Sequence, residues 1–292
     1  MSILFETEYQ GERFVGFERP APGTPLRLHR VAEGGLAATL AEVGSPAALP
    51  AAVAATTESI TVTDAELRYL PPLASANSLV SGFMQTHRSK MDGPRPDGPV
   101  DPPKWFFKGF GSWLKLPGEP LVVPAEPVAL IEEPEIVLVY ANDEHGTPHY
   151  AGYTFGNDLC DIGLHRRNPA YNPYCKLCDT SIAPWLFLDA PPATVNGRVR
   201  IERDGETAWE GAFGCGLDDL YYTAGDMAEH LLSTYPAVRR PGLVNYVLLG
   251  ADSASFHAGF RIADGDVVDI DFSSHGVRLD NPVEFARLPA TV

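Results

Sequence analysis

Apolar and polar residues alternate in short runs over the first seventy positions, and turns that contain glycine or proline separate these runs. Such runs predict β-strands, and the stretch Leu36 to Val43 predicts a helix. The expected strands are Leu4 to Tyr9, Arg13 to Arg19, Leu26 to Val31 and Ile60 to Val62. The sequence therefore predicts a small α+β domain over residues 1–72, which ends at Pro71 and Pro72.

A stretch rich in proline and glycine, Asp92 to Pro103, predicts either a mobile lid or an exposed connector. Beyond it the chain alternates short apolar runs with turn residues, and one helix is expected from about Leu217 to Tyr235. This spacing is typical of a mostly β core, either a barrel or a sandwich. We therefore predict a β-rich α+β fold with a larger domain over residues 73–292. The expected strands are Leu121 to Val123, Ile136 to Tyr140, Tyr150 to Phe155, Trp185 to Leu188, Arg198 to Glu202, Val244 to Leu249 and Val267 to Phe272.

Two of these strands flank a polar segment, residues 141–149, whose composition indicates a hairpin turn. Because side chains alternate along a strand, Glu133 and Glu135 are expected on one face. A hairpin centred between residues 145 and 146 sets Asp158 opposite Glu133 and Gly156 opposite Glu135. Directly opposed residues share a face, with Cβ atoms roughly 5 Å apart. The register thus predicts three carboxylates in one small volume, with a glycine that makes room for them.

Three carboxylates this close repel one another by several kcal/mol in a partly buried site, so a positive group is expected among them. Oxygen ligands alone favour Mg²⁺, with Mn²⁺ or Ca²⁺ next, and leave coordination positions for water or substrate. In the alternative interpretation, Glu133 and Glu135 lie on a solvated strand face and Asp158 caps a turn. A shift of one residue in the register would separate the cluster.

The charge balance narrows the range of partners. The 22 basic and 38 acidic residues give a net charge of −16, which repels phosphate backbones and anionic lipid. Nucleic acid and membrane surfaces are therefore not expected as partners. The chain has no apolar run long enough to cross a membrane and no signal-peptide pattern at its start, so we expect a cytoplasmic protein. Its four cysteines are expected to be thiols, and Cys175 and Cys178 are read as ordinary buried residues.

Several segments in a fixed order resemble the fumarylacetoacetate hydrolase superfamily over residues 105–283. They are the runs Glu133 to Val139 and Gly152 to Asp158, then Lys176, Thr180 and Pro184, and finally Gly265 to Val268, Gly276 and Asn281 to Val283. The resemblance implies a mixed β-roll catalytic domain, a smaller N-terminal domain and a homodimer. It also implies a divalent metal that Glu133, Glu135 and Asp158 bind. The reactions known for this superfamily are hydrolysis of C–C bonds, decarboxylation, dehydration and tautomerisation of keto acids.

Two segments are similar to 2-keto-3-deoxy sugar-acid dehydratases within this superfamily: Trp105 to Gly109 and Asn168 to Lys176. The resemblance makes Lys176 the catalytic proton carrier, because a divalent cation beside a partly desolvated lysine lowers its pKa. Lys108 is expected either to bind the substrate carboxylate or to neutralise the acidic pocket. Thr180 is a substrate-binding hydroxyl or a buried threonine bonded to the backbone. Arg166 clamps an anionic tail or forms an ion pair at the rim.

The segment Ser81 to His87 lies near the position where hydrolytic relatives carry a histidine that activates water. His87 is thus either a catalytic base or an exposed lid residue, and its spacing from Gly82 is off by one. Two departures alter the expected pocket. The Ser-Ala-Arg-Asp of the family is replaced by Cys160 to Gly163, and the threonine of a Gly-Thr pair is Ala251, for which Ser253 is a candidate replacement.

These features lead to a principal functional hypothesis: an Mg²⁺-dependent enzyme that dehydrates a small 2-keto-3-deoxy sugar acid. In this reading the metal binds the keto-acid end, Lys176 moves the C3 proton and the 4-hydroxyl leaves as water. The first alternative is a hydrolase of C–C bonds or a decarboxylase that acts on an acylpyruvate or a β-keto acid, which a working His87 would favour. The second alternative is a non-catalytic member that binds no metal.

Overall fold

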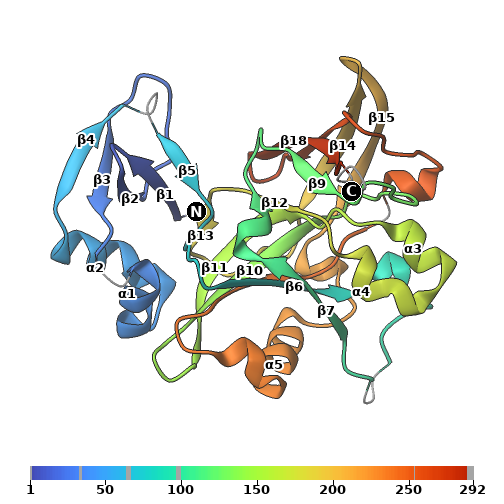
Figure 1. Ribbon diagram of the computed structural model, residues 1–292. Coiled ribbons are helices and arrows are strands. Elements are labelled where there is room, and N and C mark those ends of the chain that lie inside the picture. The colour runs from blue at the N-terminus through green and yellow to red at the C-terminus, as the bar shows by residue number, and fades with distance from the viewer. Residues whose placement is uncertain (1, 33–34, 64–66, 97–99, 253, 288–292) are drawn as a thin grey trace, which may run out of the picture.

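The hairpin predicted from the sequence is the centre of the fold. In the computed structural model, which describes residues 2–32, 35–63, 67–96, 100–252 and 254–287, it consists of β10 (Pro134–Asn142) and β11 (Pro148–Asn157). Both strands lie inside a long sheet (Figure 1) whose order is β4-β3-β2-β1-β13-β11-β10-β16-β6-β7. The other strands of this path are β1 (Ile3–Tyr9), β2 (Glu12–Gly16), β3 (Leu26–Arg30), β4 (Ser59–Val62), β6 (Ser78–Met84), β7 (Lys104–Phe110), β13 (Leu186–Phe187) and β16 (Val244–Leu248).

The predicted register holds at the end of the hairpin that carries the carboxylates. Glu135 pairs with Gly156, and the pairing continues in step as far as Val139. Between Val139 and Tyr140 the register shifts by one residue, so Tyr140 pairs with Tyr150. A β-bulge thus inserts one residue into β11. The turn is centred on residue 145, and the prediction of a centre between residues 145 and 146 is wrong by half a residue.

A smaller sheet packs over the central one and encloses the largest hydrophobic cluster. Its order is β15-β14-β17-β18-β9, and it lies above the central hairpin in Figure 1. Alternation along β10 sends Ile136 and Leu138 into this cluster, while Val137 and Val139 pack into a second cluster on the opposite face. The strands are β9 (Leu121–Val123), β14 (Asn196–Arg203), β15 (Glu206–Gly214), β17 (Val267–Phe272) and β18 (Val277–Phe285).

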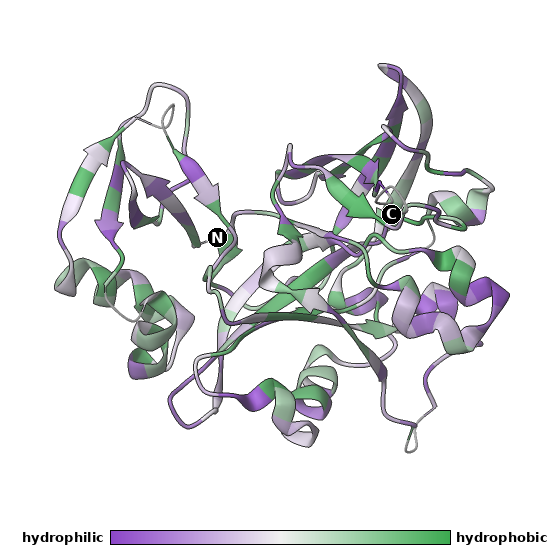
Figure 2. Ribbon diagram, viewed as in Figure 1, coloured by the Kyte–Doolittle hydropathy of each residue, from purple (hydrophilic) through white to green (hydrophobic). Residues whose placement is uncertain are grey.

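Five α-helices in the described part of the chain lie around the sheets. The predicted helix from Leu217 to Tyr235 is correct only from residue 224 onward, where the structure has α5 (Ala224–Thr234). The backbone N–H of Tyr221 donates to the Thr86 carbonyl, which interrupts the helix, and Thr223 then caps α5 through the N–H of Asp226. The others are α1 (Gly35–Val43), α2 (Leu49–Thr56), α3 (Ile162–Arg167) and α4 (Asn172–Cys175). Hydrophobic residues concentrate on the central strands, whereas α3 and α4 are more hydrophilic (Figure 2).

The N-terminal strands and helices form a unit to one side of the central hairpin (Figure 1). Its strand β1 pairs with β13, where Ile3 lies opposite Phe187, so the long sheet runs through this unit without a break. The β-rich architecture is confirmed, whereas a domain boundary at residue 72 stays a prediction. No single helix in the described part of the chain is long and apolar enough to span a membrane, although α1 and the segment Pro46–Thr56 meet that test together as a pair bent by 109°.

Candidate active site

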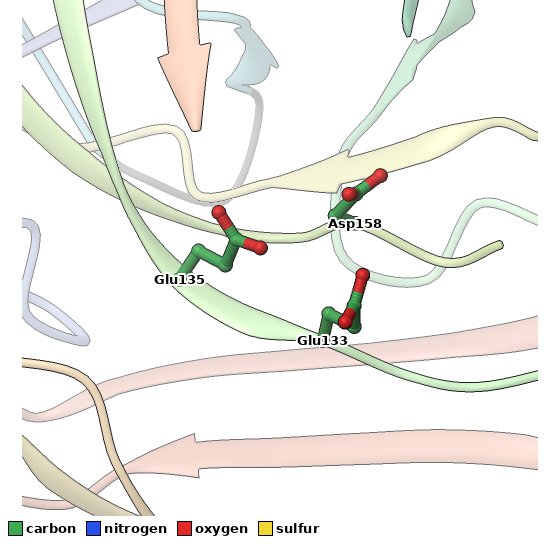
Figure 3. A group of neighbouring side chains, drawn as sticks. All are labelled: Glu133, Glu135 and Asp158. Carbon is green, nitrogen blue, oxygen red and sulfur yellow. The ribbon is translucent and has the colours of Figure 1, made fainter. Parts of the chain in front are cut away.

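Three carboxylates meet at the open end of the central hairpin, as the register predicts. Glu133 directly precedes β10, Glu135 is the second residue of that strand, and Asp158 directly follows β11. The backbone N–H of Asp158 donates to the Glu133 carbonyl over 2.9 Å and so fixes the pairing. All three side chains are buried, and one oxygen from each lies within 4.8 Å of the others (Figure 3).

Gly156 is needed for strand packing and not to make room for the carboxylates. A Cβ atom at this position would lie 2.9 Å from the Ser181 carbonyl oxygen and 2.9 Å from Cγ2 of Val137. Ser181 belongs to β12 (Thr180–Ile182), which pairs with β11 at Gly156 and Asn157. The glycine therefore lets β12 approach the hairpin closely, and this differs from the predicted reason for its presence.

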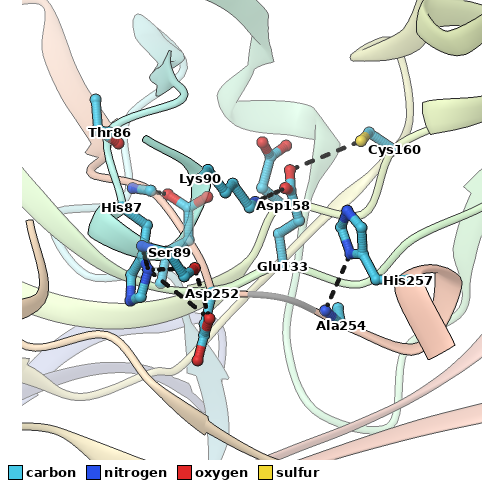
Figure 4. Close-up of polar contacts among 12 residues, drawn as sticks. Thr86, His87, Ser89, Lys90, Glu133, Asp158, Cys160, Asp252, Ala254 and His257 are labelled. Carbon is cyan, nitrogen blue, oxygen red and sulfur yellow. Dashed lines mark hydrogen bonds and ion pairs between the residues drawn. The ribbon is translucent and has the colours of Figure 1, made fainter. Parts of the chain in front are cut away.

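Three lysine ammonium groups surround the carboxylates. Nζ of Lys176 lies 2.6 Å from Glu133 Oε2 and 2.5 Å from Asp158 Oδ2, and it stands 4.6 Å from the centre of the Phe106 ring. Nζ of Lys108, from β7, lies 2.8 Å from Asp158 Oδ1. Nζ of Lys90 approaches Glu133 Oε1 to 2.9 Å (Figure 4). The formal charges of the two sets therefore cancel within the cluster.

The pKa values follow from this pairing. Burial disfavours the charged forms, but Lys176 and Lys90 outweigh burial at Glu133 and lower the pKa of its carboxyl. Burial also works against the ammonium of Lys176, yet Asp158 and Glu133 raise its pKa well above the usual value. Among the described residues, no lysine ammonium lies within ion-pair distance of Glu135. Burial, followed by Asp158 and Glu133, raises the pKa of Glu135, which accepts a hydrogen bond of 2.6 Å from the Gly250 N–H.

The donor set fits a hard divalent cation. Each of the three residues offers carboxylate oxygens, the ligand type that Mg²⁺, Mn²⁺ and Ca²⁺ prefer, and the described residues contain no other cluster of this kind. The Lys176 ammonium already bridges oxygens of Glu133 and Asp158, so the site attracts positive charge from within the chain itself. Glu133, Glu135 and Asp158 are therefore the residues that would hold a metal ion.

A cavity of about 390 Å³ opens onto this cluster, within the size range of small-molecule sites. Lys90, His165 and His257 line it but were not predicted as site residues. A larger cavity of about 810 Å³ lies beside α1, away from the carboxylates. The smaller cavity is lined by Phe83, Met84, Gln85, Thr86, Ser89, Lys90, Ile131, Glu133, Glu135, Ile162, His165, Arg166, Asn172, Cys175, Lys176, Gly250, Ala251 and His257.

Comparison with known proteins gives a relative that is similar in sequence over part of the chain. No protein-family model matches the chain. A protein of Haloferax volcanii named as a probable 2-keto-3-deoxyxylonate dehydratase is 27% identical over 191 residues, which are 63% of this chain and 61% of that protein. The match thus spans less than two thirds of the relative.

Solved structures share the fold over almost the whole chain. The apo form of 2-keto-3-deoxy-D-arabinonate dehydratase aligns with a TM-score of 0.70 at 17% identity and covers 98% of this chain and 100% of its own. The same enzyme complexed with magnesium and 2,5-dioxopentanoate gives 0.69 at 18% identity, with the same coverage. A 5-carboxymethyl-2-hydroxymuconate delta-isomerase from Mycobacterium smegmatis gives 0.65 at 19% identity, covering 99% of this chain and 100% of its own. The predicted resemblance to the fumarylacetoacetate hydrolase superfamily is confirmed.

The structure places His87 in a buried hydrogen-bond network and not in the wall of the cavity. It is buried, with Nδ1 2.8 Å from Ser89 Oγ and Nε2 3.1 Å from the Gly214 carbonyl oxygen, and Ser89 Oγ donates to Asp252 (Figure 4). It is absent from the residues that line the described cavity. The prediction of an exposed lid residue is wrong because the side chain is only 5% exposed, and the geometry gives no support to the catalytic base.

The other predicted substrate-binding residues lie in different surroundings. Lys108 is 1% exposed and bonds to Asp158 and to the Leu159 carbonyl, which favours neutralisation of the carboxylates over a substrate contact. Thr180 is buried on β12, and its hydroxyl has no hydrogen-bond partner in the described structure, so the predicted bond to the backbone is absent. Arg166 lines the cavity, whereas Ser253 lies outside the described residues.

The departures from the superfamily pattern leave the cavity wall more apolar. Cys160 is buried with Sγ 3.7 Å from Glu133 Oε2, and Ile162 and Ala251 both line the cavity. These side chains carry neither the guanidinium nor the hydroxyl of the family pattern. All four cysteines are free and buried, which confirms the prediction of thiols and the predicted burial of Cys175 and Cys178.

Proposed function

We propose that the protein is a metal-dependent lyase that removes water from a small 2-keto-3-deoxy acid. The observation that carries this proposal is the buried cluster of Glu133, Glu135 and Asp158 with Lys176, beside a cavity of ligand size that Glu133, Glu135 and Lys176 line. Relatives named as sugar-acid dehydratases support the same reaction class. Mg²⁺ is the proposed cofactor, with Mn²⁺ or Ca²⁺ as other oxygen-seeking ions.

In the proposed reaction the C3–H and C4–O bonds of the substrate break, and the proton and the hydroxyl leave together as water. A divalent cation bound by the three carboxylates would stabilise negative charge on the keto oxygen and lower the pKa of Lys176. Lys176 is the proposed proton carrier, because its Nζ lines the cavity and the ring of Phe106 holds it beside the carboxylates. The proton that its amine takes from C3 returns to the departing hydroxyl.

The remaining residues act around this centre. Lys108 forms an ion pair with Asp158 and so orients that carboxylate. We propose Arg166 as a substrate contact at the cavity wall, and Thr180 and Ser253 stay predictions. A homodimer and a cytoplasmic location are likewise expectations.

Hydrolysis of a C–C bond is the competing reaction, and it needs a base that activates water. The contacts of His87 to Gly214 and Ser89 engage both of its ring nitrogens, which favours elimination over hydrolysis. If hydrolysis nevertheless occurs, His87→Ala should abolish it while leaving dehydration almost unchanged.

The test is direct. Purified protein is incubated with Mg²⁺ and a panel of 2-keto-3-deoxy acids, and mass spectrometry follows the loss of 18 Da that accompanies dehydration. Glu135→Gln should lose at least 99% of the activity, and Glu119→Gln, which changes a carboxylate outside the cavity, should retain it. Cleavage of an acylpyruvate with no dehydration of any panel member would replace this proposal by the hydrolase. Absence of any metal-dependent turnover and of Mg²⁺ binding would favour a non-catalytic protein.

A further inference from the structure

More basic side chains than carboxylates line the cavity. Lys90 and Lys176 are engaged with Glu133, but Arg166, His165 and His257 line the same cavity as well. Arg166 has no carboxylate within ion-pair distance in the described structure, and its guanidinium stacks toward the Phe256 ring at 6.0 Å. Nδ1 of His165 is buried and lacks a hydrogen-bond partner among the described residues.

This arrangement is unusual for the chain as a whole, which carries 38 acidic and 22 basic residues. Of the nearby carboxylates, Glu133 accepts from Lys90 and Lys176, and Asp252 accepts from Ser89. The described residues thus supply no carboxylate partner for Arg166, whose side chain is exposed at the cavity wall and free to bind an external anion.

The basic groups also act on one another. Lys90, Arg166 and His257 line the same cavity, and the pKa of His257 is lowered by burial and further by the positive charges of Lys90 and Arg166. Figure 4 shows Lys90 and His257 on either side of Glu133. Burial lowers the pKa of His165 in the same way, with Arg166 and Lys176 adding to the effect. At neutral pH the two histidines are therefore neutral hydrogen-bonding groups beside the fixed charge of Arg166.

We propose that Arg166, assisted by His165 and His257, binds a second carboxylate of the substrate, so that the acid dehydrated here is a 2-keto-3-deoxy diacid. A planar guanidinium matches a carboxylate in a bidentate pair, and a neutral sugar tail would leave that charge unpaired. This inference rests on the proposed function, because it assumes that the keto-acid end of the substrate lies at Glu133, Glu135 and Asp158.

Unreactive analogues test the subsite by binding alone. Calorimetric titration in MgCl₂ compares pyruvate, 2-oxopentanoate and 2-oxoglutarate; the last two have five carbons each and differ in the charge of the tail. A charge-assisted hydrogen bond contributes about 1.5–3 kcal/mol, so 2-oxoglutarate should bind at least tenfold more tightly than 2-oxopentanoate. Arg166→Gln should remove this preference. Arg167→Gln, which changes the neighbouring arginine that does not line the cavity, should keep it.

The outcomes separate the two proposals. Equal binding of 2-oxoglutarate and 2-oxopentanoate, with pyruvate also bound, overturns the second-carboxylate site and keeps the keto-acid site. A preference for 2-oxoglutarate that depends on Arg166 but not on Mg²⁺, together with no binding of pyruvate, keeps the anion site and overturns the proposed function. Failure of all three acids to bind overturns both. If the preference for 2-oxoglutarate survives Arg166→Gln, another group binds the second carboxylate, and this result also refutes the inference.

Discussion

Lys176 and a divalent cation compete for the same oxygens, and this makes the effect of removing the lysine predictable. Nζ lies 2.6 Å from Glu133 Oε2 and 2.5 Å from Asp158 Oδ2. Since Mg–O distances are about 2.1 Å, an ion on the Glu133 oxygen would lie no farther than about 4.7 Å from an unmoved Nζ. At an effective dielectric near 20, a single and a double positive charge at that distance repel by roughly 7 kcal/mol.

The wild-type protein reduces this repulsion by moving or deprotonating Lys176, so only part of it opposes metal binding. We expect Lys176→Met to bind Mg²⁺ at least a hundredfold more tightly, which corresponds to about 2.7 kcal/mol. Without Mg²⁺ the variant should melt at a lower temperature, because Glu133 and Asp158 lose a buried counter-charge. Added Mg²⁺ should therefore raise its melting temperature more than that of the wild type.

Isothermal titration with Mg²⁺ at pH 8 measures the affinity, since protons compete little for the carboxylates there, and circular dichroism verifies the fold. Lys115→Met is the matched control, because Lys115 pairs with Asp179 at 3.6 Å outside the cavity, and its Mg²⁺ affinity should equal that of the wild type. A folded Lys176→Met variant with unchanged or weaker Mg²⁺ affinity would refute the idea that the ammonium and the ion share one site. The variant should also lose turnover.

Two further predictions concern stability. Gly250 has φ +123°, and an added Cβ would collide with Oγ1 of Thr86, so Gly250→Ala should lower the free energy of unfolding by about 3 kcal/mol or more. The control Gly242→Ala should lower it by about 1 kcal/mol, because φ is +68° there and the space around it is open. Urea unfolding measures both variants, and equal losses would contradict the collision. Burial raises the pKa of Glu132 from 4.5 to about 7, so its folded form binds the proton more tightly and stability falls as pH rises between these values. In EDTA, the wild type should lose about 3 kcal/mol relative to Glu132→Gln between pH 5 and pH 8, and parallel profiles would show that Glu132 does not titrate in this way.

The carboxylate cluster could be predicted because it depends on local rules. Side chains alternate along β10, and a two-stranded antiparallel hairpin relates each residue to one partner, so Glu133, Glu135 and Asp158 follow from counting. The bulge between Val139 and Tyr140 could not be counted in advance, but it lies on the turn side of the carboxylates and leaves their register intact. A bulge nearer the open end would have moved Asp158 to the other face.

The surrounding basic groups could not be predicted in this way, because loops and not strand periodicity position them. Lys90 reaches Glu133 from a short 3-10 turn, Arg88–Lys90, and His257 lies in a turn about a hundred residues after the hairpin. One signal was available for Lys90, since it lies three residues after His87 in a segment already suspected of covering the site. For His257 the sequence carries no comparable signal. The first part of the predicted helix from Leu217 to Tyr235 is wrong for a similar reason, because Tyr221 bonds to Thr86 across the fold.

The charges of the site connect the metal and the second carboxylate. Glu133, Glu135 and Asp158, when all are ionised, balance the ammonium groups of Lys90, Lys108 and Lys176. A divalent cation adds two positive charges to a buried volume, which is unfavourable unless anions follow it. A keto acid with one carboxylate leaves one positive charge there, and Arg166 adds another at the cavity wall. A diacid neutralises the added ion and brings its second carboxylate to a site where the guanidinium lacks a partner, so Mg²⁺ and a diacid should strengthen each other's binding more than Mg²⁺ and a monoacid do.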